Sequence, residues 1–540
     1  MKAVLSSLFL ISISLLILGC AHGETQASSE IFLLIEKAQP INYNNMVIDG
    51  DLIFGKKIVN SEINIKNCTI KGAVDFRGAT FKKPVYLVDN KFKGILLADE
   101  STQFSERVTF LNSDFNDIIY FNFATFNDFA SFKNSSFKDA NFNNVNFNKD
   151  ANFIDCAFKG NSYFDNVIFS GDVDFQKCRF NGIARFEASG FKKGASFLDL
   201  ISKYITFRNA KFDGKADFTN STFDNSIWGN CNFKESAIFN DVEFKDTAFF
   251  RDTNFEGTAD FENSDFWGDV VFKGCIFNRS AYFGLSKFHQ SADFSGAKFK
   301  ESAEFLRVPF QGLVSNFNET QFNGDVSFED ATFSGCLYLT KTKFNKMYIR
   351  WNNINKLGYD DAAYMALLEN FKKLGMLDDA DSCYYEYRKE HRYQNWTSTV
   401  QTGMLGTLDQ PFRKTIDYFL DKLYAYGVDP LRPIMYSVII IFLCAFLWWI
   451  VGLGKLFDRN GGKIKKYSVV LSFKDPLIFS FLVFISAAKF LIETPMVKIP
   501  QPIEIATPWS RYIFFFEKIF AGLLLALFFV AVSRTIVRNA

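Results

Sequence analysis

The sequence predicts a mainly β chain in which a solenoid of very short strands is followed by an α-helical region with transmembrane helices. Two observations support this prediction: a regular spacing of phenylalanine through the middle of the chain, and apolar runs near the C-terminus. Composition agrees, since 68 of the 540 residues are Phe, whereas a mixed globular core would also use Leu, Ile and Val heavily. One residue type used this often indicates a repeated structural slot.

Composition also limits the function. The net charge is +1, so no global field favours nucleic acid, and none is expected as a partner. The chain has three histidines, His22, His289 and His391, which argues against His-dependent catalysis. We find no phosphate-binding loop, zinc-ligand spacing or nucleophile motif. The protein is therefore predicted not to be an enzyme and to need no cofactor or metal.

Residues 1–23 are predicted to be a signal peptide or a signal anchor. Lys2 precedes an apolar run that is too short for a comfortable membrane span but suits the hydrophobic part of an export signal. The run ends in Ile-Leu-Gly-Cys, which resembles a bacterial lipoprotein box with Cys20 as the lipidated residue. Ala21-His22-Gly23 offers an ordinary cleavage site instead. Both readings place the following residues outside the cytoplasm.

The phenylalanine spacing alternates between five and six residues, so the repeating unit has eleven residues. A small residue such as Ala, Cys or Val stands two positions before most of these Phe, and Trp228 takes one Phe slot. The positions that mark the predicted core stack most clearly are Phe153, Phe158, Phe164, Phe169, Phe175, Phe180, Phe261, Phe266, Phe272, Phe277, Phe283, Phe288, Phe294 and Phe299. The spacing is disturbed near residues 198–207 and 311–321, where we expect bulges or loops.

Neither a helix nor a long strand fits this spacing. In a helix of about 100° per residue, successive Phe would fall on opposite sides and no apolar stripe would form. In a strand, alternation of five and six would break the two-residue period. A chain that turns a corner every five or six residues satisfies the pattern, because each short side then buries one large and one small residue. Asn, Asp and Gly, which are frequent between the Phe, suit such corners.

The segments Ala259–Asp260–Phe261 and Ala292–Asp293–Phe294, with their small-x-Phe spacing, resemble the pentapeptide-repeat proteins in a Phe-rich variant. The resemblance implies a right-handed quadrilateral β-helix over residues 48–345, with about 22 residues per coil and about 13 coils stacked along the axis. Neither end of such a solenoid can bury its last layer alone. Residues 24–47, with their apolar stretch, are predicted to be the N-terminal cap.

The cysteines can be read in two ways. Nine Cys in an exported protein would allow disulfides. However, Cys156 and Cys178 occupy the small inward slot before a Phe, which favours buried filler. They lie 22 residues apart and are expected in adjacent coils, at a distance that a disulfide allows, so they form a candidate stacked pair.

The C-terminal part is predicted to be helical and then membrane-embedded. Residues 346–430 are predicted to form a helical hairpin, joined at Gly375, and a juxtamembrane helix. Residues 431–540 contain three apolar segments, 434–451, 476–491 and 512–532, and the last tolerates Glu517 and Lys518 in its first turns. The middle segment is short, so it either spans the membrane or re-enters.

Basic residues predict the orientation of these segments. The loop from Lys455 to Lys466 has five basic residues and Asp458, and the tail carries Arg534 and Arg538. The positive-inside rule places both in the cytoplasm if residues 476–491 cross fully. The solenoid would then lie outside, in agreement with the export signal, and the protein would be a multi-pass protein of the cell membrane.

A second resemblance gives an alternative. The hairpin, the sequence Tyr-Gly-Val-Asp-Pro at residues 426–430, and the order span, short apolar segment, span look like pentapeptide-repeat proteins fused to two-span potassium-channel pores. The resemblance implies a cytoplasmic repeat domain and a filter near Ser486, Ala487, Ala488 and Lys489. This segment lacks the glycine pair of such a filter, and a Lys would oppose cations. Residues 486–489 therefore predict a degenerate pore at most.

The sequence is compatible with three functions to different degrees. A neutral, regular rod beside a membrane suits a scaffold or interaction surface with membrane lipid and an unidentified protein as partners, and flat faces and paired spans favour a homo-oligomer. The channel-like protein is the alternative. DNA mimicry, known among strongly acidic pentapeptide-repeat proteins, is disfavoured because acidic and basic residues nearly balance in the repeats.

Overall fold

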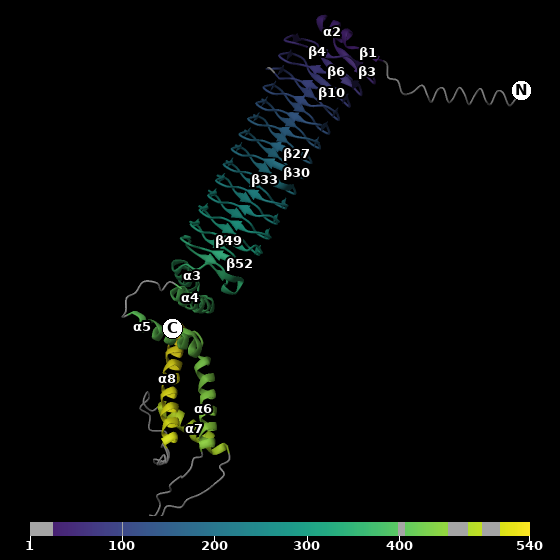
Figure 1. The fold of residues 1–540 in the computed structure, drawn as a ribbon. Helices are drawn as coiled ribbons and strands as arrows, with labels where there is room; N and C mark the ends of the chain where they lie inside the picture. The colour runs from purple at the N-terminus through teal and green to yellow at the C-terminus, as the bar shows by residue number, and fades with distance from the viewer. Residues whose placement is uncertain (1–24, 100, 398–405, 452–472, 489–507, 540) are drawn as a thin grey trace, which may run out of the picture. The chain divides into compact units, whose positions relative to one another are not determined.

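The computed structural model describes residues 25–99, 101–397, 406–451, 473–488 and 508–539 (Figure 1). The chain forms two compact units that divide between Ala363 and Tyr364. The first unit is a parallel β-solenoid and the second is helical. The predicted fold class is therefore confirmed. Residues 1–24, and with them the predicted export signal and Cys20, lie outside the described part of the chain.

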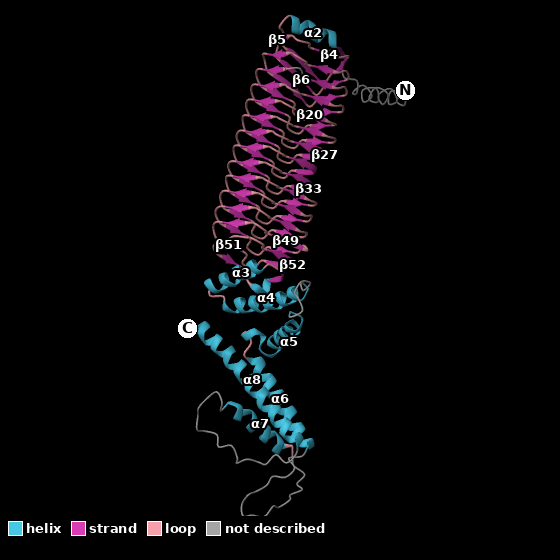
Figure 2. Ribbon diagram, turned by 60° about the vertical axis from the view of Figure 1, so that its left-hand side comes forward, coloured by secondary structure: helices cyan, strands magenta, loops and turns pink. Residues whose placement is uncertain are grey.

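The solenoid consists of about 14 turns whose strands pair in parallel with those of the next coil (Figure 2). Three sheets run along it. One has 15 strands, from β2 (Ile41–Asn44) to β53 (Met347–Tyr348). A second has 13 strands, from β5 (Ile58–Val59) to β50 (Gln321–Phe322). The third, with 26 strands, includes β1 (Thr25–Ala27) and β54 (Ile354–Leu357) and contributes two strands to most coils.

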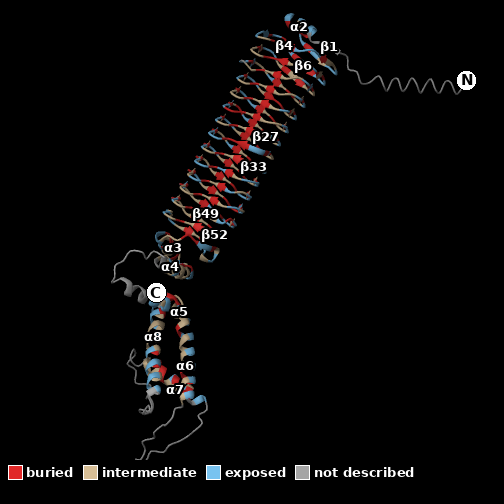
Figure 3. Ribbon diagram, in the orientation of Figure 1, coloured by how far each residue is buried: buried red, intermediate tan, exposed pale blue. Residues whose placement is uncertain are grey.

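A single coil illustrates the four sides. It runs through β22 (Ala151–Asn152), β23 (Ala157–Phe158), β24 (Ser162–Tyr163) and β25 (Ile168–Phe169) before β26 (Val173–Asp174) pairs with β22. Each side has a two-residue strand, because the chain turns a corner after every five or six residues. The small residue and the Phe of each side are buried, and the residue between them is less buried. Buried positions follow one another along the strands of the solenoid (Figure 3).

Two corners of this coil place a residue in the left-handed conformation, at Asp155 (φ 58°) and Asn166 (φ 55°). Asn, Asp and Gly fill most equivalent corners along the solenoid, since these residues tolerate positive φ. Phe123 (φ 61°) and Leu285 (φ 61°) are exceptions in which a large apolar side chain adopts this conformation.

Both predicted disturbances of the repeat are one-residue changes in coil length. Phe180 pairs with Ser202, 22 residues on, but Ile183 pairs with Tyr204, 21 residues on, and two sides merge into the single strand β30 (Ile201–Thr206). In the second region the coil gains a residue, since Ala292 pairs with Ser315. The expected loops are thus absorbed within the described strands and corners.

The solenoid extends beyond both predicted boundaries. β2 lies inside the predicted cap, and β53 and β54 lie inside the region predicted to be helical. The physical reason is the same at both ends: Tyr43, Ile349 and Ile354 stand at positions that Phe takes in the inner coils, so the Phe spacing does not mark these coils.

Helix α2 (Ser28–Glu36) covers the first coil. Ile31 and Ile35 are buried, and the ring of Phe32 lies edge-on to that of Phe54 at 6.0 Å. The chain therefore closes the N-terminal layer with an amphipathic helix, as a solenoid requires. The predicted cap of residues 24–47 thus comprises β1, α2 and the first strand of the solenoid proper.

The helical unit contains most of α3 (Asp361–Lys373), then α4 (Leu377–Thr397), α5 (Gly406–Tyr424) and the short η2 (Ala425–Gly427). Gly375, with φ 71°, forms the turn between α3 and α4, as predicted from the sequence.

Three apolar helices follow, α6 (Leu431–Val451), α7 (Lys474–Ala488) and α8 (Pro508–Asn539). All three pack against one another. Two segments of the described chain, Leu431–Val451 and Arg511–Ser533, are long and apolar enough to cross a membrane, whereas the apolar part of α7 is shorter.

Candidate functional site

The fourteen predicted core Phe are all buried in the solenoid and form columns along its axis. Within a column, rings one coil apart lie nearly parallel, as for Phe153 and Phe175 at 4.7 Å and 5°. Between columns they meet edge-to-face, as for Phe153 and Phe164 at 5.6 Å and 90°. Both are favourable geometries for aromatic rings. The interior is thus a packed core rather than a ligand site.

Cys156 and Cys178 lie in adjacent coils, both buried and both as free thiols. Their Sγ atoms donate to backbone carbonyls of Phe132 (3.0 Å) and Phe153 (2.9 Å). Ser221, at an equivalent slot, donates in the same way to Phe197. Burial raises the pKa of the Cys178 thiol well above its ordinary value. The two cysteines therefore act as hydrogen-bonding filler, and the raised pKa of Cys178 makes that thiol unreactive.

The predicted pore-like segment, residues 486–489, overlaps the last turn of α7. Ser486, Ala487 and Ala488 are helical, and the Ser486 hydroxyl donates to the backbone carbonyl of Val483 at 2.7 Å. Lys489 lies outside the described residues.

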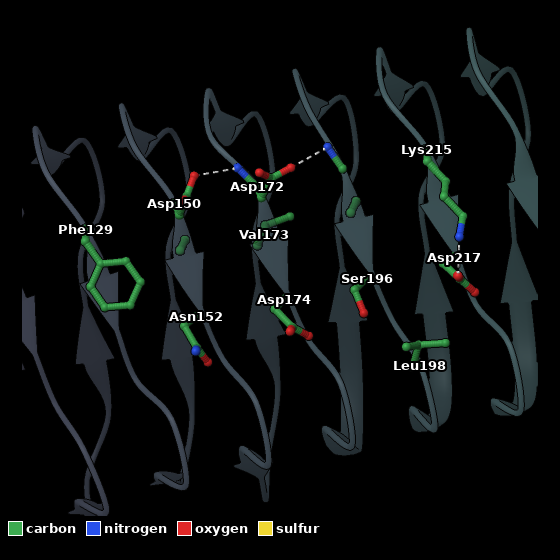
Figure 4. Close-up of a pocket in the computed structure, with 13 residues that line it drawn as sticks. Phe129, Asp150, Asn152, Asp172, Val173, Asp174, Ser196, Leu198, Lys215 and Asp217 are labelled. Atoms are coloured by element: carbon green, nitrogen blue, oxygen red, sulfur yellow. Dashed lines mark hydrogen bonds and ion pairs between the residues drawn. The ribbon is translucent and has the colours of Figure 1, made fainter.

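The outer face of the 15-stranded sheet has a shallow depression (Figure 4). It is lined by β22, β26, β29 (Ala195–Ser196) and β32 (Ala216–Asp217), with Phe129, Val173 and Leu198 supplying apolar surface. Asp, Asn, Ser and Lys side chains stand between these apolar groups.

The carboxylates of this depression bind the backbone. Asp150 accepts the N–H of Asp172 at 2.9 Å, and Asp172 accepts the N–H of Gly194 at 2.9 Å. Asp217 forms an ion pair with Lys215 at 2.9 Å. The acidic residues thus fix the corners of successive coils. They do not form a pair poised for acid–base chemistry, and no group of three metal-ligating side chains occurs among the described residues.

A stacked aromatic pair on the solenoid surface was not predicted from the sequence. The rings of Trp267 and His289 lie 3.9 Å apart at 5°, and His289 Nδ1 is 3.0 Å from Gln311 Oε1. The three residues are spaced by 22, so the coil period would have placed them in one outward column. Trp267 remains 47% exposed on the surface of the solenoid.

The largest polar network of the described helices joins α4 to α5. Arg392 donates to Asp421 at 3.0 Å, and Arg388 donates to Asp417 at 3.2 Å. The Tyr385 hydroxyl donates to Asp421 at 2.9 Å, and that of Tyr426, from η2, donates to Asp417 at 3.0 Å. We call these six residues the junction network.

Electrostatics within the junction network follow from burial and hydrogen bonding. Burial opposes the charge of Asp421, but hydrogen bonds from Tyr385 and Arg392 outweigh this and lower the pKa of the carboxyl group. Burial, together with the bond to Asp417, raises the pKa of the Tyr426 phenol. Both groups therefore keep their charge state around neutral pH, which suits a structural joint.

The network continues into the first apolar helix. Arg432, in the first turn of α6, donates to Asp429 at 3.1 Å and to the backbone carbonyl of Asp421 at 3.1 Å. Ala425 and Tyr426 adopt positive φ, 50° and 54°, where the chain turns from α5 into α6. No short sequence motif marks this joint, because its partners come from three separate helices.

Comparison with known families finds one description, pentapeptide repeats (9 copies). The matches cover residues 110–157, 153–199, 207–253, 239–287, 272–315 and 283–332. All of them lie within the solenoid, and the potassium-channel resemblance of the C-terminal part receives no support. No curated protein and no solved structure matches the chain.

Proposed function

Because residues 110–199 and 207–332 are pentapeptide repeats stacked as a β-solenoid, we propose that the protein is a non-enzymatic, membrane-anchored scaffold. The solenoid presents a rigid, regular surface to a protein partner, and the apolar helices hold it at a lipid bilayer. The proposal joins the two units of the chain in one role.

The surface of the solenoid supports a binding role. The coils are fixed by backbone pairing and by side chains such as Asp172, so exposed groups are held in place before a partner arrives. Such preorganisation lowers the entropic cost of binding. Trp267, with its exposed ring, and the depression near Phe129 and Leu198 offer the mixed aromatic and polar character that protein interfaces favour.

A single observation carries the membrane part of the proposal. The 21-residue α6 and the 23-residue segment Arg511–Ser533 are apolar, yet only 17% of each apolar window is buried inside the unit. Outward-facing side chains include Ile439, Phe442 and Ile519, each about half exposed or more. A core helix of a soluble protein would be covered. At 1.5 Å per residue the two segments measure about 32 and 35 Å, which matches a hydrocarbon core of about 30 Å.

The orientation we propose places the solenoid outside the cytoplasm. It is supported by the predicted export signal at residues 1–23 and by the basic loop from Lys455 to Lys466. The role of residues 476–491 decides how many times the chain crosses. Helix α7 has 15 residues, so its length of about 22 Å falls short of a full crossing within the described residues.

The test is an accessibility experiment on sealed spheroplasts that express the full chain with a C-terminal tag. A membrane-impermeant amine reagent is added, and peptides containing the exposed solenoid residues Lys203 and Lys273 are quantified by mass spectrometry. We expect labelling of both lysines in intact spheroplasts, and retention of the chain in membranes after alkaline carbonate washing.

The outcomes separate the parts of the proposal. If carbonate releases the chain, membrane anchoring is wrong. If the lysines react only after lysis, the solenoid lies inside and the export signal is misassigned. Accessibility of the C-terminal tag then gives the number of crossings: a tag on the side opposite the solenoid means three, and a tag on the same side means two.

A further inference from the structure

Glu517 of α8 is fully buried among the three apolar helices of the second unit. Its Oε2 accepts the indole N–H of Trp448, from α6, at 3.0 Å. Its Oε1 lies in hydrogen-bond contact with the hydroxyl of Ser480, from α7. One carboxyl group thus bonds to both neighbouring helices.

The number of protons available for hydrogen bonds in this cluster indicates the charge state of Glu517. The Ser480 hydroxyl lies 2.9 Å from the backbone carbonyl of Ile441, which can only accept. If the single Ser480 proton is donated to Ile441, the contact between Ser480 Oγ and Glu517 Oε1 needs another proton. The Trp448 indole already uses its only proton on Oε2. The remaining source is the carboxyl group itself.

The ionised alternative leaves a buried charge without a counter-ion among the residues that the structure describes. No described cation forms an ion pair with Glu517. Lys518, the next residue, places its ammonium over the ring of Phe514 at 5.0 Å, and Lys474, at the start of α7, is exposed. A carboxylate removed from water without a cation or a full set of donors costs several kcal/mol or more.

Other titratable groups near the site do not supply a counter-charge. Cys444 is the titratable side chain on the facing part of α6, and it is fully buried. Beyond Lys474 and Asp475 in its first turn, the sequence of α7 contains no charged residue. Helix α5 and η2 also pack against α8, but their groups Asp421 and Tyr426 are engaged in the junction network.

We propose that Glu517 is a reversible proton-binding site of the helical unit, protonated at neutral pH and bonded through its proton to Ser480. The carboxylic acid then completes the hydrogen bonds between α6, α7 and α8. Loss of the proton places a charge between the helices and removes one of these bonds, so the packing of the short helix α7 depends on the protonation of Glu517.

Infrared spectroscopy of the full chain in detergent micelles tests the proposal. The difference spectrum of wild type minus Glu517→Gln should contain the C=O stretch of a protonated carboxyl at neutral pH, and this band should disappear as the pH is raised. Glu386→Gln, which removes a partly exposed carboxylate paired with Lys389, is the matched control and should give no such band. Gln imitates the protonated acid, since it can donate to Ser480 and accept from Trp448.

A difference spectrum with carboxylate bands and no protonated C=O stretch at neutral pH overturns the proposal. Loss of the band on addition of Na⁺ at constant pH would show that the site takes a metal cation instead. Hydrogen exchange of α7 peptides gives an independent reading. In wild type it should rise with pH more steeply than chemical exchange does, whereas Glu517→Gln should remove the excess. If both chains behave alike, protonation does not control α7.

Discussion

The solenoid and the helical unit stabilise their interiors by different means. In the solenoid, Phe rings stack on Phe rings, and interior groups such as the Ser221 hydroxyl and the Cys178 thiol donate to a carbonyl of the adjacent coil. In the helical unit, buried polar groups on separate helices bond to each other, as in the pairs Arg392–Asp421 and Trp448–Glu517. The solenoid repeats one local solution many times, whereas each bond of the helical unit occurs once.

This difference predicts which substitutions should lower the free energy of unfolding most in each unit. A coil contacts only its neighbours, so its loss of stability depends on how much apolar surface is removed. The helical unit depends on matched charges, so removal of one partner leaves the other buried without compensation. The following experiments test this contrast, from the largest expected effect to the smallest.

The largest effect is expected from Phe175→Ala in the solenoid. Phe175 is fully buried between Phe153 and Phe197, so truncation leaves a cavity and should lower the free energy of unfolding by about 3–5 kcal/mol. Thermal unfolding of the full chain, with hydrogen exchange of solenoid peptides, measures the loss. Phe175→Leu, which keeps most of the volume, should lose clearly less. Equal losses would contradict a packing origin.

A somewhat smaller effect is expected from Asp421→Asn in the junction network. The substitution removes the nearer of the two carboxylates that pair with Arg392, since Asp417 lies at 3.8 Å, and should destabilise the helical unit by about 2 kcal/mol. Hydrogen exchange of α4 and α5 peptides measures it. Lys389→Gln, which breaks an exposed pair with Glu386, is the control and should cost at most about 0.5 kcal/mol.

The same residue gives the helical unit a pH dependence. The pKa of Asp421 is lower in the folded chain than in the unfolded chain. Its stabilising contribution is therefore complete above the unfolded value of 3.8 and is lost as the pH falls through the folded pKa. Acid should destabilise wild type more than Asp421→Asn. An identical acid response of the two chains would refute the role given to this carboxylate.

A gain of about 1 kcal/mol is expected from Ser202→Ala. Ser202 is buried in register with Phe180 and Phe223, and its hydroxyl has no hydrogen-bond partner among the described residues. The matched control is Ser221→Ala in the same solenoid, because the Ser221 hydroxyl donates to the carbonyl of Phe197 at 2.7 Å. Thermal unfolding should move in opposite directions for the two variants.

The smallest change is expected from Phe123→Asn at a corner of the solenoid. Phe123 has φ 61° and is 58% exposed, so Asn should relieve about 1 kcal/mol of backbone strain with little loss of burial. Asn144, with φ 59° at the equivalent corner of the next coil, provides the reverse experiment. Asn144→Phe should lower the unfolding temperature, and a rise would contradict the strain argument.

The sequence predicted much of the solenoid because the residues of each repeat specify the conformation of that repeat. The alternation of five and six residues fixes where each Phe points, and all fourteen Phe that marked the repeat are buried. The boundaries were less accurate, since the terminal coils have Tyr43 and Ile349 where the inner coils have Phe. The Phe spacing does not mark the aromatic pair of Trp267 and His289, because Trp267 is exposed on the solenoid surface and the spacing reports inward positions.

The helical unit was predicted only as a set of elements. Hydropathy and length identified α6 and α8, and Gly375 marked the turn of the hairpin. The partners within the unit were beyond such reasoning. Trp448 and Glu517 are 69 residues apart, and Arg392 and Asp421 are 29 apart, so no periodicity relates them.

The coil, its period and its Phe interior could be derived from the sequence alone, because residues within one repeat specify each corner and each inward position. The polar contacts between the helices could be identified only in the tertiary structure. They include the hydrogen bonds of Glu517 with Ser480 and Trp448. The physical reason is that stacking of identical coils propagates a local rule. Helix packing instead brings together side chains that are distant in the sequence, and their ion pairs and hydrogen bonds form only where the folded helices meet.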